Sequence, residues 1–248
     1  MLSVHIADIG PRRALRALRL RPSPAKVSGL RYAETLLAAP LRSGTVVGPQ
    51  PGRVALLAAW HDDDALDGFL AEHPLARLLE PGWQVRLEPL RSRGAWSPLP
   101  DLPGVEPVGE SDPVAVLTLG RLRLSRLPAF LATSAKAERT AVTHPALLAG
   151  TALARPPRIV ATFSLWRTTR EMREYAVGQR PGAHRAAIDA HVAHAFHDES
   201  VFVRFRPYSA RGTWGAAGSA LDARPAAARP EGEHTRLAGT PPLARRTP

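Results

Sequence analysis

Histidines gather in one short segment of the sequence and are its most obvious source of chemistry. Four of the nine histidines of the chain fall there, at His184, His191, His194 and His197. A neutral imidazole binds transition metals, and its ordinary pKa lies close enough to neutral pH for acid–base catalysis. The segment therefore raises the possibility of a metal or heme site.

The spacing within this segment predicts a helix that would position two of the histidines. Gly178 is expected to end the preceding helix, and Pro181 to begin a new one over 183–195. His184 and His191 then share one helix face, with His184 in the first turn. The free backbone amides of a first turn disfavour an imidazolium, so this ring tends to stay neutral, the form that ligates iron.

Three interpretations of the histidines stay open on the residues alone. The first is that they are surface residues of an alanine-rich helix. The second is a zinc or non-heme iron site made by His191, His194 and His197, although steps of three residues do not bring three side chains well onto one helix face. The third is a single axial histidine beneath a heme in an apolar pocket, with His184 as first choice and His191 as second.

The chain around this segment is duplicated. The stretch "LRSRGAW" (90–96) returns as "YSARGTW" (208–214), and "RVALLAAW" (53–60) mirrors "RIVATFSLW" (158–166). An aromatic residue, Phe69 or Tyr175, follows Trp60 and Trp166 at the same distance. Because the matches extend over most of both halves, we interpret both tryptophans and both RG-x-W motifs as framework, with glycine freeing a turn and tryptophan packing one end of the fold.

Periodicity predicts the same order of elements in each half. The expected elements are strands at 2–10 and 114–124, helices at 25–39 and 125–142, strand pairs at 44–52 with 53–60 and at 150–157 with 158–166, helices at 61–79 and 167–178, and closing strands at 83–90 and 200–208. The order βαββαβ is the ferredoxin-like unit, and two such units can bury their bare sheet faces against each other. We therefore expect an α+β fold in which two tandem ferredoxin-like repeats, 1–108 and 109–214, form an intrachain dimeric α+β barrel, followed by a disordered tail at 215–248.

The two halves differ in a way that points back to the histidines. Phe69 and Val85 are sixteen positions apart, whereas Tyr175 and Val203 are twenty-eight positions apart. The twelve extra residues belong to the histidine segment. What both halves hold is expected to be structural, and what only one half holds is a candidate for chemistry.

Composition narrows the class of protein. The chain of 248 residues has no cysteine, which excludes disulfides, thiolate ligands and a cysteine nucleophile and favours a cytoplasmic location. Its net charge of +11 comes almost wholly from arginine, and since no nucleic-acid motif accompanies it we expect no nucleic-acid partner. The basic stretch from Pro11 to Arg21 could lie on a membrane surface, although a solvated helix face is the more common explanation.

Other possible sites are weaker. The run Asp62 to Asp64 looks like a pair of catalytic acids, but at a helix start such residues more often cap free amides. No glycine-rich phosphate loop or nucleophile elbow is present. No apolar run reaches the ~20 residues of a membrane-spanning helix, and the first residues do not read as a secretory signal.

The C-terminal half resembles a known enzyme family. The stretch "TFSLWRTTREMREYAVGQRPGAHRAAIDAHVAHAFHDESVFVRFRPYSARGTW" (162–214) combines an F-S-[IL]-W strand, an H-x-x-A-I segment and a basic strand that ends in RG-x-W. This combination is similar to the spheroidene monooxygenase family of carotenoid-modifying enzymes, and the N-terminal half is similar more loosely through "VALLAAW" and "RSRGAW". The chain departs from the pattern at His144, where an acidic residue is typical, and in its compact N-terminal half and added tail.

The resemblance implies a heme-containing oxygenase of dimeric α+β barrel type. Such an enzyme would bind heme b and oxidise an apolar polyene such as spheroidene with dioxygen and an electron donor. His184 matches the histidine of the H-x-x-A-I segment and is the implied iron ligand. Tyr175 or His191 could donate a hydrogen bond near bound oxygen, and Arg204 or Arg206 could pair with heme propionates, although the strand face that carries both arginines could simply meet solvent.

Two functions of other classes stay open beside this one. A cofactor-independent oxygenase of the same fold would use Trp166, Tyr175 and a histidine to activate an aromatic substrate. A non-catalytic relative would only bind a small apolar ligand or a partner. Association into a homo-oligomer and visits to a membrane are compatible with either.

Overall fold

The computed structural model describes residues 1–41, 50–99, 102, 104, 109–178 and 196–216 of the chain. Its strands are β1 (Leu2–Asp8), β2 (Leu30–Pro40), β3 (Arg53–Trp60), β4 (Trp83–Ala95), β5 (Val114–Leu122), β6 (Leu147–Arg155), β7 (Ile159–Trp166) and β8 (His197–Arg211). Its helices are α1 (Pro11–Arg19), α2 (Asp63–Glu72), α3 (Pro74–Leu79), the short 3-10 helix η1 (Leu124–Arg126), α4 (Leu127–Val142) and α5 (Thr169–Gly178).

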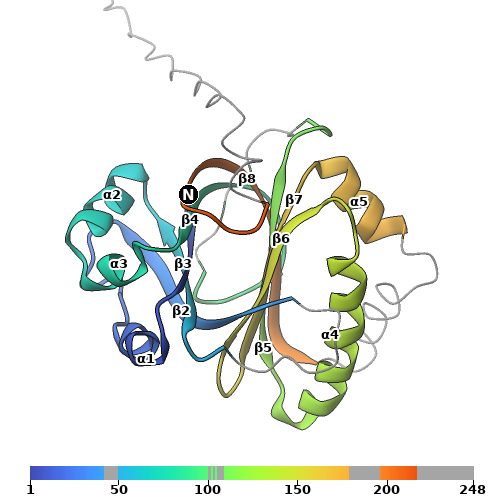
Figure 1. Cartoon of the computed structure of the whole chain (residues 1–248), viewed down its shortest axis with the longest axis horizontal. Coiled ribbons are helices and arrows are strands. Elements are labelled where there is room, and N and C mark those ends of the chain that lie inside the picture. The colour runs from blue at the N-terminus through green and yellow to red at the C-terminus, as the bar shows by residue number, and fades with distance from the viewer. Residues whose placement is uncertain (42–49, 100–101, 103, 105–108, 179–195, 217–248) are drawn as a thin grey trace, which may run out of the picture.

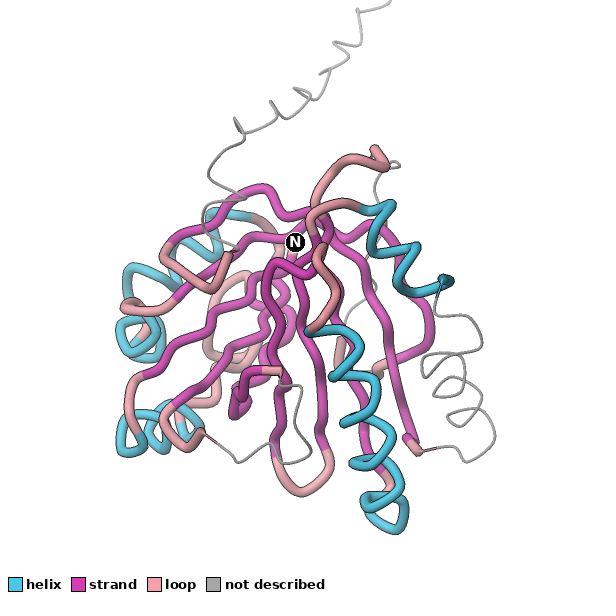
Figure 2. The backbone as a smooth tube through the Cα atoms, turned by 45° about the vertical axis from the view of Figure 1, so that its right-hand side comes forward, coloured by secondary structure: helices cyan, strands magenta, loops and turns pink. Residues whose placement is uncertain are grey.

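The strands close into one antiparallel barrel with the order β1-β3-β2-β6-β7-β5-β8-β4. Within it, each half of the chain forms a four-stranded sheet of ferredoxin-like order, and the two sheets join where β2 pairs with β6 and β4 pairs with β8. Equivalent strands therefore meet at both seams, as expected for an intrachain pseudo-dimer. Helices α1 to α3 flank one half-sheet and α4 and α5 the other, all outside the barrel (Figures 1 and 2). The fold class expected from the sequence is confirmed.

Two local predictions are wrong. The helix expected over 25–39 is absent, because that stretch holds the strand β2 and the helix of this position is α1. Leucine and alanine in "LRYAETLLAAP" favour a helix locally, but pairing with β3 and β6 overrides this preference. The helix expected over 61–79 is two helices, since Pro74 lacks the amide needed to continue α2 and instead begins α3.

Apolar side chains from all eight strands fill the interior of the barrel. Trp83, Phe163 and Phe205 are among the largest fully buried side chains, and they belong to one continuous cluster. Trp96 and Trp214, the tryptophans of the RG-x-W motifs, join the same cluster and are 4% and 7% exposed. This interior is a packed core, so its role is to position what lies outside it.

The two RG-x-W motifs are structural, with Gly94 near the end of β4 and Gly212 directly after β8. Gly94 and Gly212 have φ values of +87° and +81°, a backbone region that favours glycine. A Cβ atom at either position would also collide with a backbone carbonyl oxygen, that of Ser200 at Gly94 and that of Gly82 at Gly212. The framework interpretation of these motifs is thus supported by their geometry.

Candidate functional site

The outer faces of the two half-sheets are covered to very different extents. On β3, Val54, Leu56, Ala58 and Trp60 all face the N-terminal helices and are fully buried. At the equivalent positions of β7, Val160, Thr162 and Ser164 remain partly exposed, and only Trp166 is buried. On the neighbouring strand, Thr118 is exposed where its counterpart His5 is 3% exposed. We call the surface formed by Thr118, Val160, Thr162 and Ser164 the open face.

The helices beside the open face pack loosely on it. In the N-terminal half each helix buries apolar side chains, such as Ala14 of α1, Phe69 of α2 and Leu75 of α3. Among the side chains of α4 that the structure describes, none is fully buried, and α5 buries Met172 and Thr169. The duplicated frame is therefore sealed on one side and accessible on the other, which makes the C-terminal side the candidate site.

An aromatic cluster borders the open face. The ring of Trp166 lies 4.7 Å from that of Tyr175, and His144 lies 5.5 Å from both rings. The indole of Trp166 donates to Ser164 Oγ at 3.0 Å, and the amide of Ala146 donates to His144 Nδ1 at 3.2 Å. Burial raises the pKa of Tyr175, so its hydroxyl keeps its proton at neutral pH. Tyr175 is thus a protonated phenol beside Trp166 and His144, and its predicted catalytic role stays a prediction.

The two arginines predicted on β8 have different surroundings. Arg206 forms an ion pair with Glu88 on the adjoining strand β4. Arg204 is half-buried, and its Nε is buried without a hydrogen-bond partner among the described residues. Burial lowers the pKa of Arg204, and the nearby charges of other arginines lower it further. Of the two predicted arginines, Arg206 is thus paired with a carboxylate, whereas Arg204 has a buried nitrogen without a hydrogen-bond partner among the described residues.

The histidines that opened the sequence argument lie mostly outside the described residues. His184, His191 and His194 fall in the segment 179–195, so their predicted roles stay predictions. His197 begins β8, where its ring lies 5.3 Å from that of Phe130 in an edge-on contact. No three His, Asp or Glu side chains within the described part of the chain are grouped so that they could hold a metal ion.

One polar site was missed by the sequence reasoning. Glu34 and Arg155 form an ion pair at the β2–β6 seam, beside a surface pocket of about 360 Å³ that Tyr32 also lines. Burial raises the pKa of Glu34, although the charge of Arg155 opposes this shift. The signal in the sequence was a single acidic residue inside an apolar strand.

The remaining surface predictions have clear outcomes. Asp62 caps α2 by accepting a 2.8 Å hydrogen bond from the amide of Ala65, which confirms the capping interpretation of the acidic run. Helix α1 buries Ala14 and Ala17 and exposes its arginines, as a solvated helix face does. None of the described helices is long and apolar enough to cross a membrane.

Comparison with known proteins gives curated relatives but no matching protein-family model. The spheroidene monooxygenase of Rubrivivax gelatinosus is 29% identical over 191 residues, 75% of this chain and 72% of the relative. That of Cereibacter sphaeroides is 26% identical over 182 residues, 70% of this chain and 56% of the relative. That of Rhodobacter capsulatus is 29% identical over 189 residues, 69% of this chain and 75% of the relative.

Two solved structures of similar fold are described by their names as a putative monooxygenase and an aldoxime dehydratase. A putative monooxygenase from Fusobacterium nucleatum covers 86% of this chain and 94% of its own, with 7% identity and a TM-score of 0.40. An aldoxime dehydratase covers 87% of this chain and 79% of its own, with 12% identity and a TM-score of 0.48. The sequence relatives confirm the resemblance stated above: over about 70–75% of its length the chain is similar to curated spheroidene monooxygenases, and this similarity supports its assignment as a monooxygenase, an oxidoreductase.

Proposed function

We propose that this protein is a heme-dependent monooxygenase that oxidises an apolar polyene at the open face of its C-terminal half. The observation that carries the proposal is the asymmetry between the halves, since among the described residues only the C-terminal half leaves its outer sheet face accessible beside aromatic side chains. An apolar polyene offers hydrophobic area and few hydrogen bonds, and the aromatic side chains at the border of the open face, Tyr175 and Phe202, could supply the apolar contact that it needs. The names of the relatives supply the reaction class and suggest the substrate.

The described residues fit a heme in two respects. Tyr175 and Phe202, both only partly buried, offer apolar surface for a macrocycle, and Arg204 has a buried Nε that lacks a partner among the described residues and could receive a propionate. When bound, heme supplies the activation of dioxygen, with electrons from an external donor. His184 is the proposed iron ligand, with His191 as second choice.

The chain itself would contribute positioning and proton control. Tyr175 keeps its proton because burial raises its pKa, so it can donate a hydrogen bond to an oxygen atom held above the open face. His191 is the alternative donor. Trp166 and Met172 would exclude water from this end of the face, since both are almost fully buried there. Arg204 would fix the orientation of the cofactor.

Titration of the purified protein with hemin tests the cofactor. The expected result is a Soret band with a histidine-ligated signature, lost in His184→Ala and retained in the control His61→Ala. His61 is a suitable control because its side chain is 79% exposed and lies in the other half. If wild type gives no such band, the heme proposal fails; if His184→Ala binds as wild type does, the ligand is misassigned.

A turnover assay then distinguishes the heme-dependent enzyme from a cofactor-independent oxygenase. Spheroidene, dioxygen and a reductant are supplied to hemin-loaded and heme-free protein, and oxidised polyene is measured. Product only from loaded protein supports the proposal. Product from rigorously heme-free protein would instead favour a cofactor-independent oxygenase, for which the contact between Trp166, Tyr175 and His144 is the specific structural support.

A further inference from the structure

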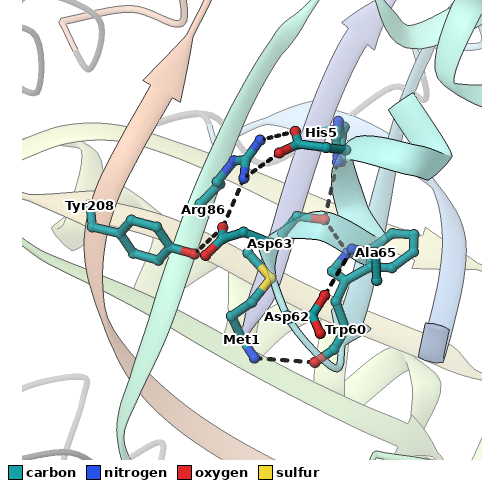
Figure 3. A network of polar contacts seen from close by, with 10 residues as sticks. Met1, His5, Trp60, Asp62, Asp63, Ala65, Arg86 and Tyr208 are labelled. Atoms are coloured by element: carbon teal, nitrogen blue, oxygen red, sulfur yellow. Dashed lines mark hydrogen bonds and ion pairs between the residues drawn. The ribbon is translucent and has the colours of Figure 1, made fainter. Parts of the chain in front are cut away.

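Arg86 and Arg204 occupy the same position in the two repeats, one residue after the matched valines of the closing strands. Arg86 is saturated with partners. Its guanidinium donates to Asp63 Oδ1 at 2.8 Å and pairs with Asp67, both on α2 (Figure 3). The Tyr208 hydroxyl donates to the same Asp63 oxygen at 2.7 Å. In the N-terminal half this position is thus a closed structural ion pair.

Every one of these partners is changed in the C-terminal half. Counting from the matched tryptophans, the positions of Asp63 and Asp67 are held by Thr169 and Arg173 on α5. The residue across the strand seam changes too, because Ser209 lies opposite Arg86 whereas Arg91 lies opposite Arg204. Two carboxylates have been lost and two further guanidinium groups gained around one position.

No anionic partner for Arg204 replaces the two lost carboxylates within the described residues. Its Nε is buried and has no hydrogen-bond partner. Burial lowers its pKa first, followed by the charges of Arg173, Arg91 and Arg93. For Arg86, burial acts in the same direction, but the hydrogen bonds and charges of Asp67 and Asp63 outweigh it and raise the pKa. A half-buried cation beside like charges is unfavourable unless an anion joins it.

Within the described part of the chain, an ion pair joins Arg173 of this group to Glu110 at the surface. Glu110 Oε1 lies 3.1 Å from Arg173, and both of these side chains are more than half exposed. Arg204 also lies beside apolar side chains, since its guanidinium is 5.8 Å from the ring of Phe202, and Phe202 belongs to one cluster with Leu90, Trp166 and Tyr175. The arginines therefore sit at the boundary between an apolar surface and solvent.

We propose that Arg204, Arg91 and Arg173, here named the arginine cluster, form an anion subsite that binds the carboxylate end of a ligand whose apolar body packs on the partly exposed rings of Phe202 and Tyr175. Guanidinium groups bind carboxylates in paired, charge-assisted hydrogen bonds, and the mixture of apolar surface and cations selects an amphipathic ligand over a free anion. The inference rests on the proposed function for the identity of that ligand, a heme with its propionates, but the anion chemistry does not need iron.

Iron-free protoporphyrin IX and its dimethyl ester test the subsite without any metal ligand. Binding is measured by quenching of tryptophan fluorescence. We expect wild type to bind the free acid with about tenfold higher affinity than the ester, or more, because one charge-assisted hydrogen bond contributes about that much. Arg204→Gln should lose this preference. Arg206→Gln is the matched control, because it lies on the same strand face but pairs with Glu88, and it should keep the preference.

Thermal unfolding gives a second, independent measurement. Removing Arg204 relieves repulsion, so Arg204→Gln should leave Tm unchanged or raise it, whereas Arg86→Gln should lower it. The subsite is refuted if wild type binds acid and ester equally, if Arg206→Gln loses the preference as Arg204→Gln does, or if Arg204→Gln lowers Tm as much as Arg86→Gln. A preserved acid preference without a hemin Soret band would retain the subsite and reject only the heme function; a Soret band without that preference would do the reverse.

Discussion

Acidification should destabilise this protein through the buried histidine His5. His5 lies on β1, is 3% exposed, and contacts Ser3 Oγ through Nε2 at 3.1 Å, while the Trp60 indole donates to the same oxygen at 2.8 Å (Figure 3). Burial, helped by the charge of Arg86, lowers the pKa of His5 to about 4. The imidazole is therefore neutral in the folded state throughout the neutral and mildly acidic range.

The size of the effect follows from the difference between the folded and unfolded pKa values. An unfolded chain has a histidine pKa near 6.5, so below that pH it binds a proton that the folded protein excludes. The contribution of neutral His5 is complete above pH 6.5 and is lost as the pH falls towards 4. A difference of about 2.5 pKa units corresponds to ~3 kcal/mol in total, of which about 2 kcal/mol is lost by pH 5.

Urea unfolding at pH 7.5 and pH 5.0 measures this contribution. The loss of unfolding free energy between the two pH values should be about 2 kcal/mol smaller in His5→Gln than in wild type. Because wild type and variant share all other titrating groups, the contributions of those groups cancel when the two losses of unfolding free energy are compared. The exposed control His61→Gln should lose as much as wild type. An equal loss in wild type and His5→Gln would refute the burial argument.

Three further predictions concern the frame. Leu56→Ala should lower the free energy of unfolding by about 2–5 kcal/mol, whereas Thr162→Ala at the equivalent position of the open face should cost less than about 1 kcal/mol, as urea unfolding will show. Gly212→Ala should lower the free energy of unfolding by at least about 1–2 kcal/mol, because φ at this position is +81°. The control Gly68→Ala lies in helix α2 with no neighbour near the added methyl group, and it should raise the free energy of unfolding by about 0.5–1 kcal/mol. Equal shifts in Tm for the two variants would contradict the backbone conformation assigned to Gly212. Arg86→Gln should cost about 1–3 kcal/mol by leaving Asp63 and Asp67 uncompensated, and Asp67→Asn should lessen that cost if the ion pair is its cause.

The duplication made the fold readable from sequence, but local propensity misled in one place. Matching tryptophans and RG-x-W motifs fixed the order of elements in both halves and hence the barrel. The strand β2 was not predicted from "LRYAETLLAAP" because its interior residues, Tyr32 and Leu36, are buried in a cluster that both halves build, and its end pairs with β6 of the other half. That information is tertiary, and no local pattern of alanine and leucine contains it.

The candidate site was only partly predictable for a related reason. Tyr175 and Arg204 were named from the sequence, and both border the open face. Aligning the halves, however, made Arg204 look structural, since Arg86 matches it. The two arginines differ in the residue that the neighbouring helix places beside them: Asp67 of α2 pairs with Arg86, whereas Arg173 of α5 lies near Arg204. This difference becomes visible only when the packing of the helices beside the closing strands is known.

The two halves together explain how one frame can carry an unfavourable site. The interior cluster and the β2–β6 and β4–β8 seams are shared, so each half is stabilised by the other. The N-terminal half adds a fully covered outer face and a saturated Arg86. The stability that these features add allows the C-terminal half to leave its outer face open and to hold Arg204 without a carboxylate, two features that lower stability. Such features persist where a ligand compensates them, which is why the poorly packed half, and not the well-packed one, is the place to look for binding.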